Sequence, residues 1–240
     1  MDLSIVIPAF EESKKIGADI EAAAAFLKSN HFVGEIIVVD DGSGDNTAEA
    51  ARGATYAATL GISLNVIRYD RHRGKGYAVR TGIKQTSGEY VMFADSGCCV
   101  PYGEALNGLK LLKSGVCEIA HGSRKMRGAN IRKAQSWHRR ICSALFRWFT
   151  IYSMKIPAEF TDTQCGFKIY RGEVARSLYG QCFTDGFMFD VEIIMRAQKQ
   201  GYKIKEFPLD WTCDRDSRVS AARNLWRVLF ELISIKRAVG

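Results

Sequence analysis

The order of apolar and polar positions in the first half of the chain predicts alternating strands and helices. Short apolar runs are typical of buried parallel strands, and here they lie near residues 3–7, 35–39, 63–68, 89–94 and 116–120. The stretches between them suit helices, and they lie near 12–29, 45–60, 75–86 and 102–114. The alanine run at 22–25 favours helix in the first of these. This alternation predicts the α/β class, with a Rossmann-like, mostly parallel central sheet flanked by helices.

The second half of the chain has a less regular pattern. Residues 122–135 are polar and basic, which predicts a loop. Helices are expected near 136–153, 187–200 and 219–238, and strands near 165–170 and 203–207. The last of these helices carries apolar residues at helical spacing. We therefore predict one catalytic domain over residues 1–218 and a C-terminal amphipathic helix over 219–240.

Composition places the chain among globular proteins. It has 240 residues, 47% of them hydrophobic and 25% charged, which allows a substantial core. No stretch approaches the ~20 apolar residues of a membrane span. The seven cysteines are irregularly spaced, and no secretory pattern opens the sequence. These features predict a reducing compartment and argue against a zinc site.

Charge is unevenly distributed along the chain. Residues 1–120 carry 12 Lys and Arg against 15 Asp and Glu, whereas residues 121–240 carry 22 against 11. The basic second half predicts an anionic partner, for which nucleic acid and a phosphorylated lipid at an anionic membrane are both candidates. Because no nucleic-acid-binding module is recognisable, we expect no nucleic-acid partner.

Acidic residues follow two of the predicted strands. Asp40 and Asp41 end the second strand and lead into Gly42 and Ser43, and Glu11 follows the first strand. Ligands of open α/β sheets bind outside the carboxyl ends of the strands, so these carboxylates suit a ribose or a base. An Asx-type turn and a solvated acid at a helix start are the structural alternatives.

A Gly-Lys-Gly segment around Lys75 opens the helix after the third strand. Glycine lets the backbone approach a ligand, and a helix start with a nearby lysine suits a diphosphate. A basic surface turn is the alternative. No Gly-x-Gly-x-x-Gly follows the first strand, which disfavours a dinucleotide cofactor.

Taken in order, several segments resemble the family 2 glycosyltransferases, which have the GT-A fold. The resemblance covers roughly residues 3–218, and its segments are 3–12, 38–43, 71–80, 90–95, 162–168 and 189–192. The last two segments resemble the polyprenyl-phosphate branch, especially its members that transfer glucose to dolichyl-type phosphate, with the mannosyl members next.

This resemblance implies an inverting hexosyltransferase that moves a sugar from a nucleoside diphosphate to a polyprenyl phosphate. UDP-glucose is the first expected donor and GDP-mannose the second. The implied nucleotide-sugar-binding residues are Pro8, Ala9, Glu11, Asp40, Asp41, Gly42, Ser43, Lys75, Asp95 and Ser96. The implied catalytic residues are Asp95, Arg124, Asp162 and Gln164. The implied acceptor-phosphate residues are Arg124, Arg139, Ser143 and Arg218.

The expected metal site departs from the pattern of the resembled family. Asp95 matches the first aspartate of its Asp-x-Asp motif, but Gly97 occupies the second position and Cys99 follows. Mg²⁺ and Mn²⁺ prefer oxygen ligands, so a single carboxylate with two phosphate oxygens could still hold one. We predict Mg²⁺ or Mn²⁺ at Asp95; the alternative is that Arg and Lys neutralise the diphosphate instead.

Two amphipathic stretches bear on membrane association. Residues 136–153 mix aromatics with arginine, and the terminal helix pairs an apolar face with cations. Many members of the resembled family carry transmembrane helices that this chain lacks, so we expect a cytoplasmic enzyme associated peripherally with the membrane, with a separate membrane partner as a further possibility. The alternatives are that both helices pack on the core, that the acceptor is a hydroxyl of a glycan or lipid-linked saccharide, or that the chain is a non-catalytic nucleotide-sugar-binding module.

Overall fold

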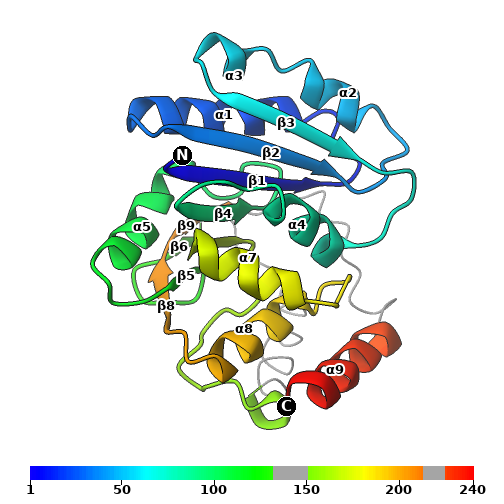
Figure 1. The fold of residues 1–240 in the computed structure, drawn as a ribbon, viewed down its shortest axis with the longest axis vertical. Helices are drawn as coiled ribbons and strands as arrows, with labels where there is room; N and C mark the ends of the chain where they lie inside the picture. Colours follow the sequence, from blue (N-terminus) through cyan, green and yellow to red (C-terminus); the bar gives the residue numbers. More distant parts are fainter. Residues whose placement is uncertain (132–150, 213–224) are drawn as a thin grey trace.

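A seven-stranded sheet forms the centre of the structure, a computed structural model that describes residues 1–131, 151–212 and 225–240 (Figure 1). In spatial order its strands are β3 (Ser63–Arg68), β2 (Gly34–Asp40), β1 (Leu3–Ala9), β4 (Tyr90–Ala94), β7 (Phe167–Arg171), β5 (Ile119–Ser123) and β8 (Ile204–Pro208). Strand β7 runs antiparallel to both of its neighbours, and the other pairs in this sheet are parallel. The predicted mostly parallel sheet is confirmed.

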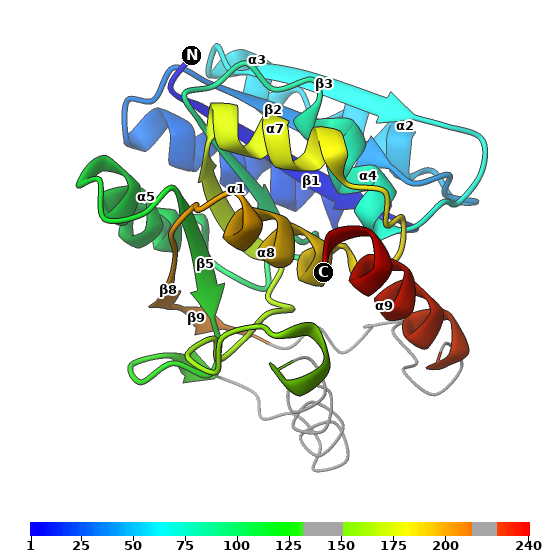
Figure 2. The same cartoon turned by 60° about the horizontal axis from the view of Figure 1, so that its bottom comes forward.

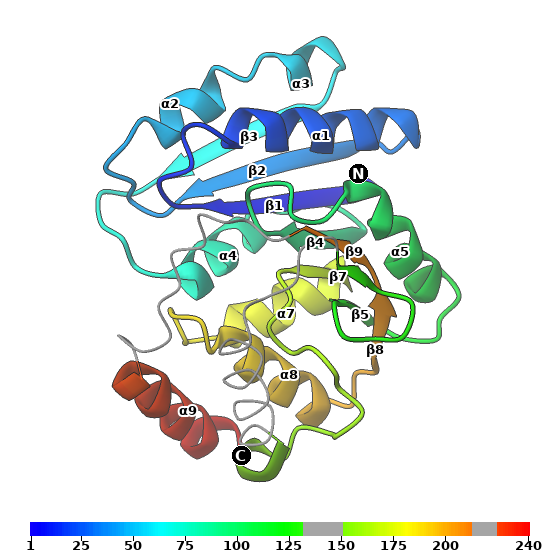
Figure 3. The same ribbon diagram turned by 180° about the vertical axis from the view of Figure 1, so that it is seen from behind.

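Helices cover both faces of the sheet, and each face has its own apolar core. On one face pack α1 (Ile16–Ser29), α2 (Thr47–Arg52), α3 (Tyr56–Thr59) and α5 (Ala105–Lys113), which follows a short 3₁₀ turn, η1 (Tyr102–Glu104). On the other face pack α4 (Lys75–Ile83), α7 (Gly172–Gln181), α8 (Phe189–Lys199) and α9 (Leu225–Val239). Figure 3 shows α1 and α5 from behind. Strand β1 is buried along its whole length, as its unbroken apolar run predicts for a central parallel strand.

Several elements differ from the sequence expectations. The helix expected over 45–60 is two short helices separated by residues 53–55. The strand expected at 116–120 begins at Ile119, where pairing with β8 sets its register. Helix α7 and the two-residue strands β6 (Asn130–Ile131) and β9 (Asp210–Trp211) were not expected. Of the helix expected at 136–153 only residues 151–154 lie within the described residues, and they are helical.

Helix α9 packs against α8 and lies at the right side of the molecule in Figure 2. Its buried side carries Leu232, Ile235 and Val239. Glu231 on this helix accepts a hydrogen bond from the backbone N–H of Met188, at 3.3 Å. Across the described ranges, none of the helices combines the length and apolar character needed to span a bilayer.

Candidate active site

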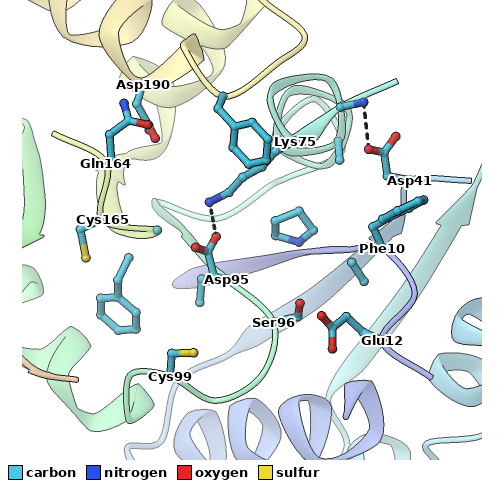
Figure 4. A pocket seen from close by; sticks show the side chains of 18 of the residues that line it. Phe10, Glu12, Asp41, Lys75, Asp95, Ser96, Cys99, Gln164, Cys165 and Asp190 are labelled. Atoms are coloured by element: carbon cyan, nitrogen blue, oxygen red, sulfur yellow. Dashed lines mark hydrogen bonds and ion pairs between the residues drawn. The ribbon is translucent and has the colours of Figure 1, made fainter. Parts of the chain in front are cut away.

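A cavity of about 510 Å³ opens at the carboxyl ends of β1, β2 and β4 (Figure 4). Its volume falls in the range of roughly 300–1,000 Å³ that is usual for small-molecule sites. The predicted residues that line it are Pro8, Ala9, Asp41, Lys75, Asp95, Ser96, Arg124 and Gln164. The sheet edge identified from the sequence is therefore the edge that carries the cavity.

The turns after β1 and β2 are locked together beside this cavity. Ser43 donates its backbone N–H to Asp40 Oδ1 at 3.0 Å, and its hydroxyl accepts the backbone N–H of Glu11 at 2.8 Å. Glu11 has a left-handed φ of 54°. Asp40 is fully buried, and its Oδ2 atom has no hydrogen-bond partner among the residues that the structure describes, although Arg68 Nε lies 3.6 Å away. Glu11, Asp40, Gly42 and Ser43 thus support the wall of the cavity without lining it.

Asp41 organises the loop that leads into α4. Its carboxylate accepts the backbone N–H groups of Arg73 and Gly74 at 2.8 and 2.9 Å, and its Oδ2 lies 2.8 Å from His72 Nδ1. Gly74 has a φ of 121°, and a Cβ there would lie 2.5 Å from the carbonyl oxygen of Asp185. Only glycine fits this turn, so Asp41 and Gly74 together fix where α4 begins.

Lys75, the first residue of α4, points across the cavity to Asp95 at the end of β4 (Figure 4). Its Nζ lies 2.5 Å from Asp95 Oδ1. Burial would lower the pKa of the lysine ammonium, but the carboxylates of Asp95 and Asp190 outweigh burial and raise it. Lys75 therefore stays charged, and it stands at a helix N-terminus, where anions are favoured.

A second ion pair stands behind Lys75. Lys168 on β7 and Asp190 on α8 are almost wholly buried, with Nζ 2.5 Å from Asp190 Oδ1. Lys168 also donates to the carbonyl of Thr163 at 3.1 Å. Burial raises the pKa of Asp190, and the charges of Lys168 and Lys75 pull it back only in part. Since Asp190 lines the cavity, it holds Lys75 by its charge while its own partner is Lys168.

Arg124, just after β5, is fixed by Asp162. Nε donates to Asp162 Oδ2 at 2.6 Å, and Nη2 donates to Oδ1 at 2.8 Å. Burial would raise the pKa of Asp162, but this paired contact with Arg124 holds it below the ordinary value of 3.8. Asp162 does not line the cavity, whereas Arg124 does. Asp162 is therefore placed to act through Arg124.

Gln164 and Gly166 bring the 161–166 segment up to Asp95. The carbonyl of Gly166 accepts the backbone N–H of Asp95 at 2.8 Å. Gln164 lies beside Asp190 (Figure 4), and its Nε2 atom is buried without a hydrogen-bond partner in the described structure. A buried amide that faces a cavity without a partner suits a polar ligand group.

Asp19 lines the cavity, although it was not among the predicted site residues. It lies in α1 and accepts the backbone N–H groups of Gly97 and Cys98 at 2.6 and 2.8 Å, together with the Cys98 thiol at 2.9 Å. Burial raises the pKa of Asp19 despite these donors. The loop after β4 is thus tied to α1. The sequence signal for this role was an acidic residue in the otherwise alanine-rich helix α1.

Other cavity residues were also missed as site residues. They are Phe10, Glu12, His72, Cys99, Cys165, Phe187, Trp211, Arg227 and Glu231. The rings of Phe10 and His72 are in contact, tilted by 36° with centroids 4.2 Å apart, and the Arg124 guanidinium lies 5.4 Å from the Trp211 ring centroid. Aromatic residues in loops carry no periodic signal, so their convergence appears only in the fold.

Asp95 fits a divalent ion as a single ligand. Within the described ranges, no three His, Cys, Asp or Glu side chains come together in a metal-binding cluster. Among the described residues, Asp95 Oδ1 has no hydrogen-bond partner of regular geometry, and the Lys75 Nζ lies 2.5 Å from it. Mg²⁺ is often held by one or two carboxylates together with substrate phosphates. The donor set therefore suits an ion that arrives with a diphosphate.

Three predicted acceptor-phosphate residues lie outside the described residues. They are Arg139, Ser143 and Arg218. Their roles stay predictions, as does the boundary after residue 218. Arg124 is the member of that set whose placement the structure describes, and it lines the cavity.

A known structure shows the class of this fold. Glucosyl-3-phosphoglycerate synthase from Mycobacterium tuberculosis, solved with Mn²⁺, UDP-glucose and phosphoglyceric acid, matches with a TM-score of 0.73. The match covers 98% of this chain and 79% of that chain at 19% identity. The fold is therefore that of the GT-A glycosyltransferases.

The chain belongs to glycosyl transferase family 2, whose family model matches residues 4–179. It is 28% identical to the dolichyl-phosphate beta-glucosyltransferase of Saccharomyces cerevisiae over 98% of this chain and 74% of the yeast protein. It is 31% identical to the human dolichyl-phosphate beta-glucosyltransferase over 88% of this chain and 67% of that protein. The protein is thus a glycosyltransferase, and the resemblance stated from the sequence is confirmed.

Proposed function

We propose that this glycosyltransferase transfers a hexose from a nucleoside-diphosphate sugar to a polyprenyl phosphate of the dolichyl type. UDP-glucose is the donor we propose first and GDP-mannose second. The glucosyl relatives support this choice through their identity over most of the chain. The transfer inverts the anomeric centre and gives a β-linked glycosyl phospholipid.

The observation that carries the proposal is a pair of cationic anchors that line the same cavity as Asp95. Lys75 stands at the start of α4, and Arg124 is held by the Asp162 fork. A helix start with a lysine suits the donor diphosphate. A guanidinium has five donors, of which Asp162 takes two, and its planar fork suits an acceptor phosphate.

A phosphate acceptor matches the state of the carboxylates in the cavity. Asp41 and Asp19 each hold a loop, and Glu12 lies 3.9 Å from the Lys15 ammonium. Asp95 pairs with Lys75, Asp190 with Lys168 and Glu231 with Arg227. A hydroxyl acceptor needs a general base. A phosphomonoester, whose second pKa is near ~6, is already an anion and needs none. Engaged carboxylates beside a fixed arginine therefore favour the phosphate acceptor over a sugar hydroxyl.

In this reaction an acceptor phosphate oxygen attacks the anomeric carbon as the bond to the donor diphosphate breaks. Lys75 neutralises the charge that develops on the departing diphosphate. Asp95 would hold a Mg²⁺ or Mn²⁺ ion together with that diphosphate, and such an ion supplies positive charge to the leaving group. Arg124 orients the attacking phosphate, and Asp162 positions Arg124. Gln164 contacts a sugar hydroxyl through its unpartnered amide.

The nucleoside lies, in our proposal, against the β1–β2 edge. Asp40 has a buried oxygen without a hydrogen-bond partner, and Glu11 stands beside it through Ser43. Both carboxylates suit the N–H and O–H donors of a base and ribose. Asp41 acts indirectly, because its oxygens already hold the loop before α4.

We further propose that the enzyme works at the cytoplasmic face of a membrane, where it is bound peripherally. A lipid acceptor demands such a surface, and the excess of Lys and Arg over Asp and Glu in residues 121–240 favours an anionic one.

The test is product analysis with the purified chain. UDP-glucose or GDP-mannose is incubated with Mn²⁺ and either a polyprenyl phosphate in detergent or a panel of saccharides. We expect an acid-labile glucosyl phosphate from UDP-glucose and polyprenyl phosphate. An acid-stable glycoside formed only with saccharides would instead establish the hydroxyl-acceptor reaction. Asp95→Ala serves as the inactive control in both arms.

A further inference from the structure

Helix α9 has two apolar faces, and only one of them is covered. Leu232, Ile235 and Val239 point into the core and are at most 5% exposed. On the opposite side, Trp226 is 85% exposed, Phe230 73% and Ile233 51%. These three side chains are spaced four and three residues apart, so they form one stripe along the helix.

The exposed stripe is more than scattered surface hydrophobicity. Single exposed apolar residues are ordinary, whereas contiguous apolar patches mark interaction sites. Here a tryptophan and a phenylalanine stand nearly free on one helix face, and a tryptophan of this kind prefers a boundary between apolar and wet surroundings. The stripe therefore fits a partner that is apolar inside and polar at its surface.

The charged residues of α9 indicate which kind of partner binds the stripe. Arg237 continues the stripe four residues after Ile233 and Lys236 flanks it, whereas Arg227 on the other flank pairs with Glu231, its Nε 3.1 Å from Glu231 Oε1. Glu231 is the one acidic residue in 225–240, and it turns inward, where it binds the N–H of Met188. The outward face thus combines apolar side chains with positive charge. This is the composition of helices that lie in the interface of an anionic bilayer.

We propose that Trp226, Phe230 and Ile233 form the membrane-docking face of this enzyme and that the surface they bind is an anionic lipid bilayer. The helix lies along the membrane plane with these three side chains in the headgroup boundary. A symmetric dimer through the same face would gather Lys236 and Arg237 of both copies in one interface, and the one acidic residue of 225–240, Glu231, turns inward, so a second copy of the chain is disfavoured.

This docking face deepens the proposed function, on which it rests for its purpose. The same helix contributes Arg227, Val228 and Glu231 to the cavity wall. A helix that touches the bilayer on one side and the cavity on another sets the cavity opening at the level of the headgroups. An acceptor phosphate in the membrane would then reach Arg124 without leaving the lipid layer.

The test compares two triple variants of the full chain for binding to vesicles. The stripe variant carries Trp226→Ser, Phe230→Ser and Ile233→Ser. The matched control removes exposed apolar side chains elsewhere, through Val33→Ser, Tyr56→Ser and Leu106→Ser, which are 64%, 43% and 44% exposed. Sedimentation uses vesicles of equal parts phosphatidylcholine and phosphatidylglycerol, with pure phosphatidylcholine as the neutral arm.

We expect the native chain and the control to bind the anionic vesicles, and the stripe variant to bind roughly a hundredfold more weakly, the scale of withdrawing three large apolar side chains from a lipid boundary. In a background with Trp137→Phe and Trp148→Phe, which removes the tryptophans of the other amphipathic stretch, lipids brominated along the acyl chain should quench part of the remaining fluorescence. Trp226→Phe should bind but lose that quenching, which places this residue in the bilayer even if the triple variant misfolds.

Three results would overturn the proposal. They are equal vesicle binding by the stripe variant and the native chain, quenching that survives Trp226→Phe, and a native dimer that only the stripe variant dissolves. Transfer to a short-chain polyprenyl phosphate in detergent separates this inference from the proposed function. That activity should persist in the stripe variant, and its absence from the native chain would refute the function without touching the vesicle result.

Discussion

Replacing Gly166 by alanine should disable the site while leaving the fold intact. A Cβ at this position would lie 2.0 Å from both Cγ and Oδ2 of Asp95 and 2.2 Å from its Oδ1. Optimal contact between such atoms is about 3.5–4.0 Å, so the overlap is well over 1 Å. The backbone cannot yield freely, because the Gly166 carbonyl holds the N–H of Asp95. The Asp95 carboxylate must therefore swing away and lose its contact with Lys75.

The expected magnitudes separate activity from stability. Overpacking of this kind costs about 1–3 kcal/mol of folding free energy, which for a chain of this size is a fall in Tm of about 2–4 °C for each kcal/mol. A misplacement of ~1 Å in a catalytic group can cost about 100-fold in rate. We therefore expect kcat/KM for sugar transfer to fall about 100-fold in a protein that still unfolds cooperatively.

Initial-rate kinetics and thermal unfolding measure the two effects on the same samples. Gly180→Ala is the control, since a Cβ there meets no atom within 4 Å and the site lies in α7. It should keep full activity and gain up to ~1 kcal/mol of stability. In an Asp95→Ala background the clash is absent, so Gly166→Ala should add almost nothing. A kcat/KM for Gly166→Ala within about twofold of the native value would refute the steric argument.

Three further outcomes follow from other contacts. Asp162→Asn should reduce the loss of unfolding free energy at acid pH. Since Arg124 holds the pKa of Asp162 below 3.8, the pair stabilises the native chain above that pH and loses its contribution as pH falls below it. Urea unfolding at several pH values measures this difference. Gly186→Ala should loosen α9, because its Cβ would lie 2.1 Å from Glu231 Oε1; amide hydrogen exchange in 225–239 should quicken, and unchanged protection would contradict the contact. Asp95→Asn should abolish the stimulation of transfer by Mn²⁺ and lower kcat about 100- to 1,000-fold, the usual effect of removing one such electrostatic group. A variant that still responds to Mn²⁺ would place the ion elsewhere.

The strands and the site edge could be predicted from sequence because their signals are local. An unbroken apolar run marks β1 and β2, and the acids that follow such runs must gather at one sheet edge, as Glu11, Asp40 and Asp41 do. The start of α4 at Lys75 was equally readable from its glycines. Local chemistry thus located this edge of the cavity.

The partners of these residues could not be predicted, because they come from distant segments. The sequence predicts Asp41 as a ligand-binding carboxylate, but its oxygens bind the loop at 72–74. Asp190 lies in the first turn of α8, but its partner is Lys168 on β7, which is distant in the sequence. Strands β6 and β9 have two residues each, which is too short for any periodic pattern.

The place of β7 in the sheet has a consequence for the order in which the protein can be assembled. Strands β4 and β5 have no direct pairing and meet only through β7, which is synthesised long after both. Until β7 has left the ribosome, the edge of β4 is open to wrong partners. The Asp95–Gly166 bond, and with it the site, closes only when this strand inserts. A nascent chain truncated before residue 167 should therefore need a chaperone, whereas one released after residue 171 should have the strand that seals its sheet.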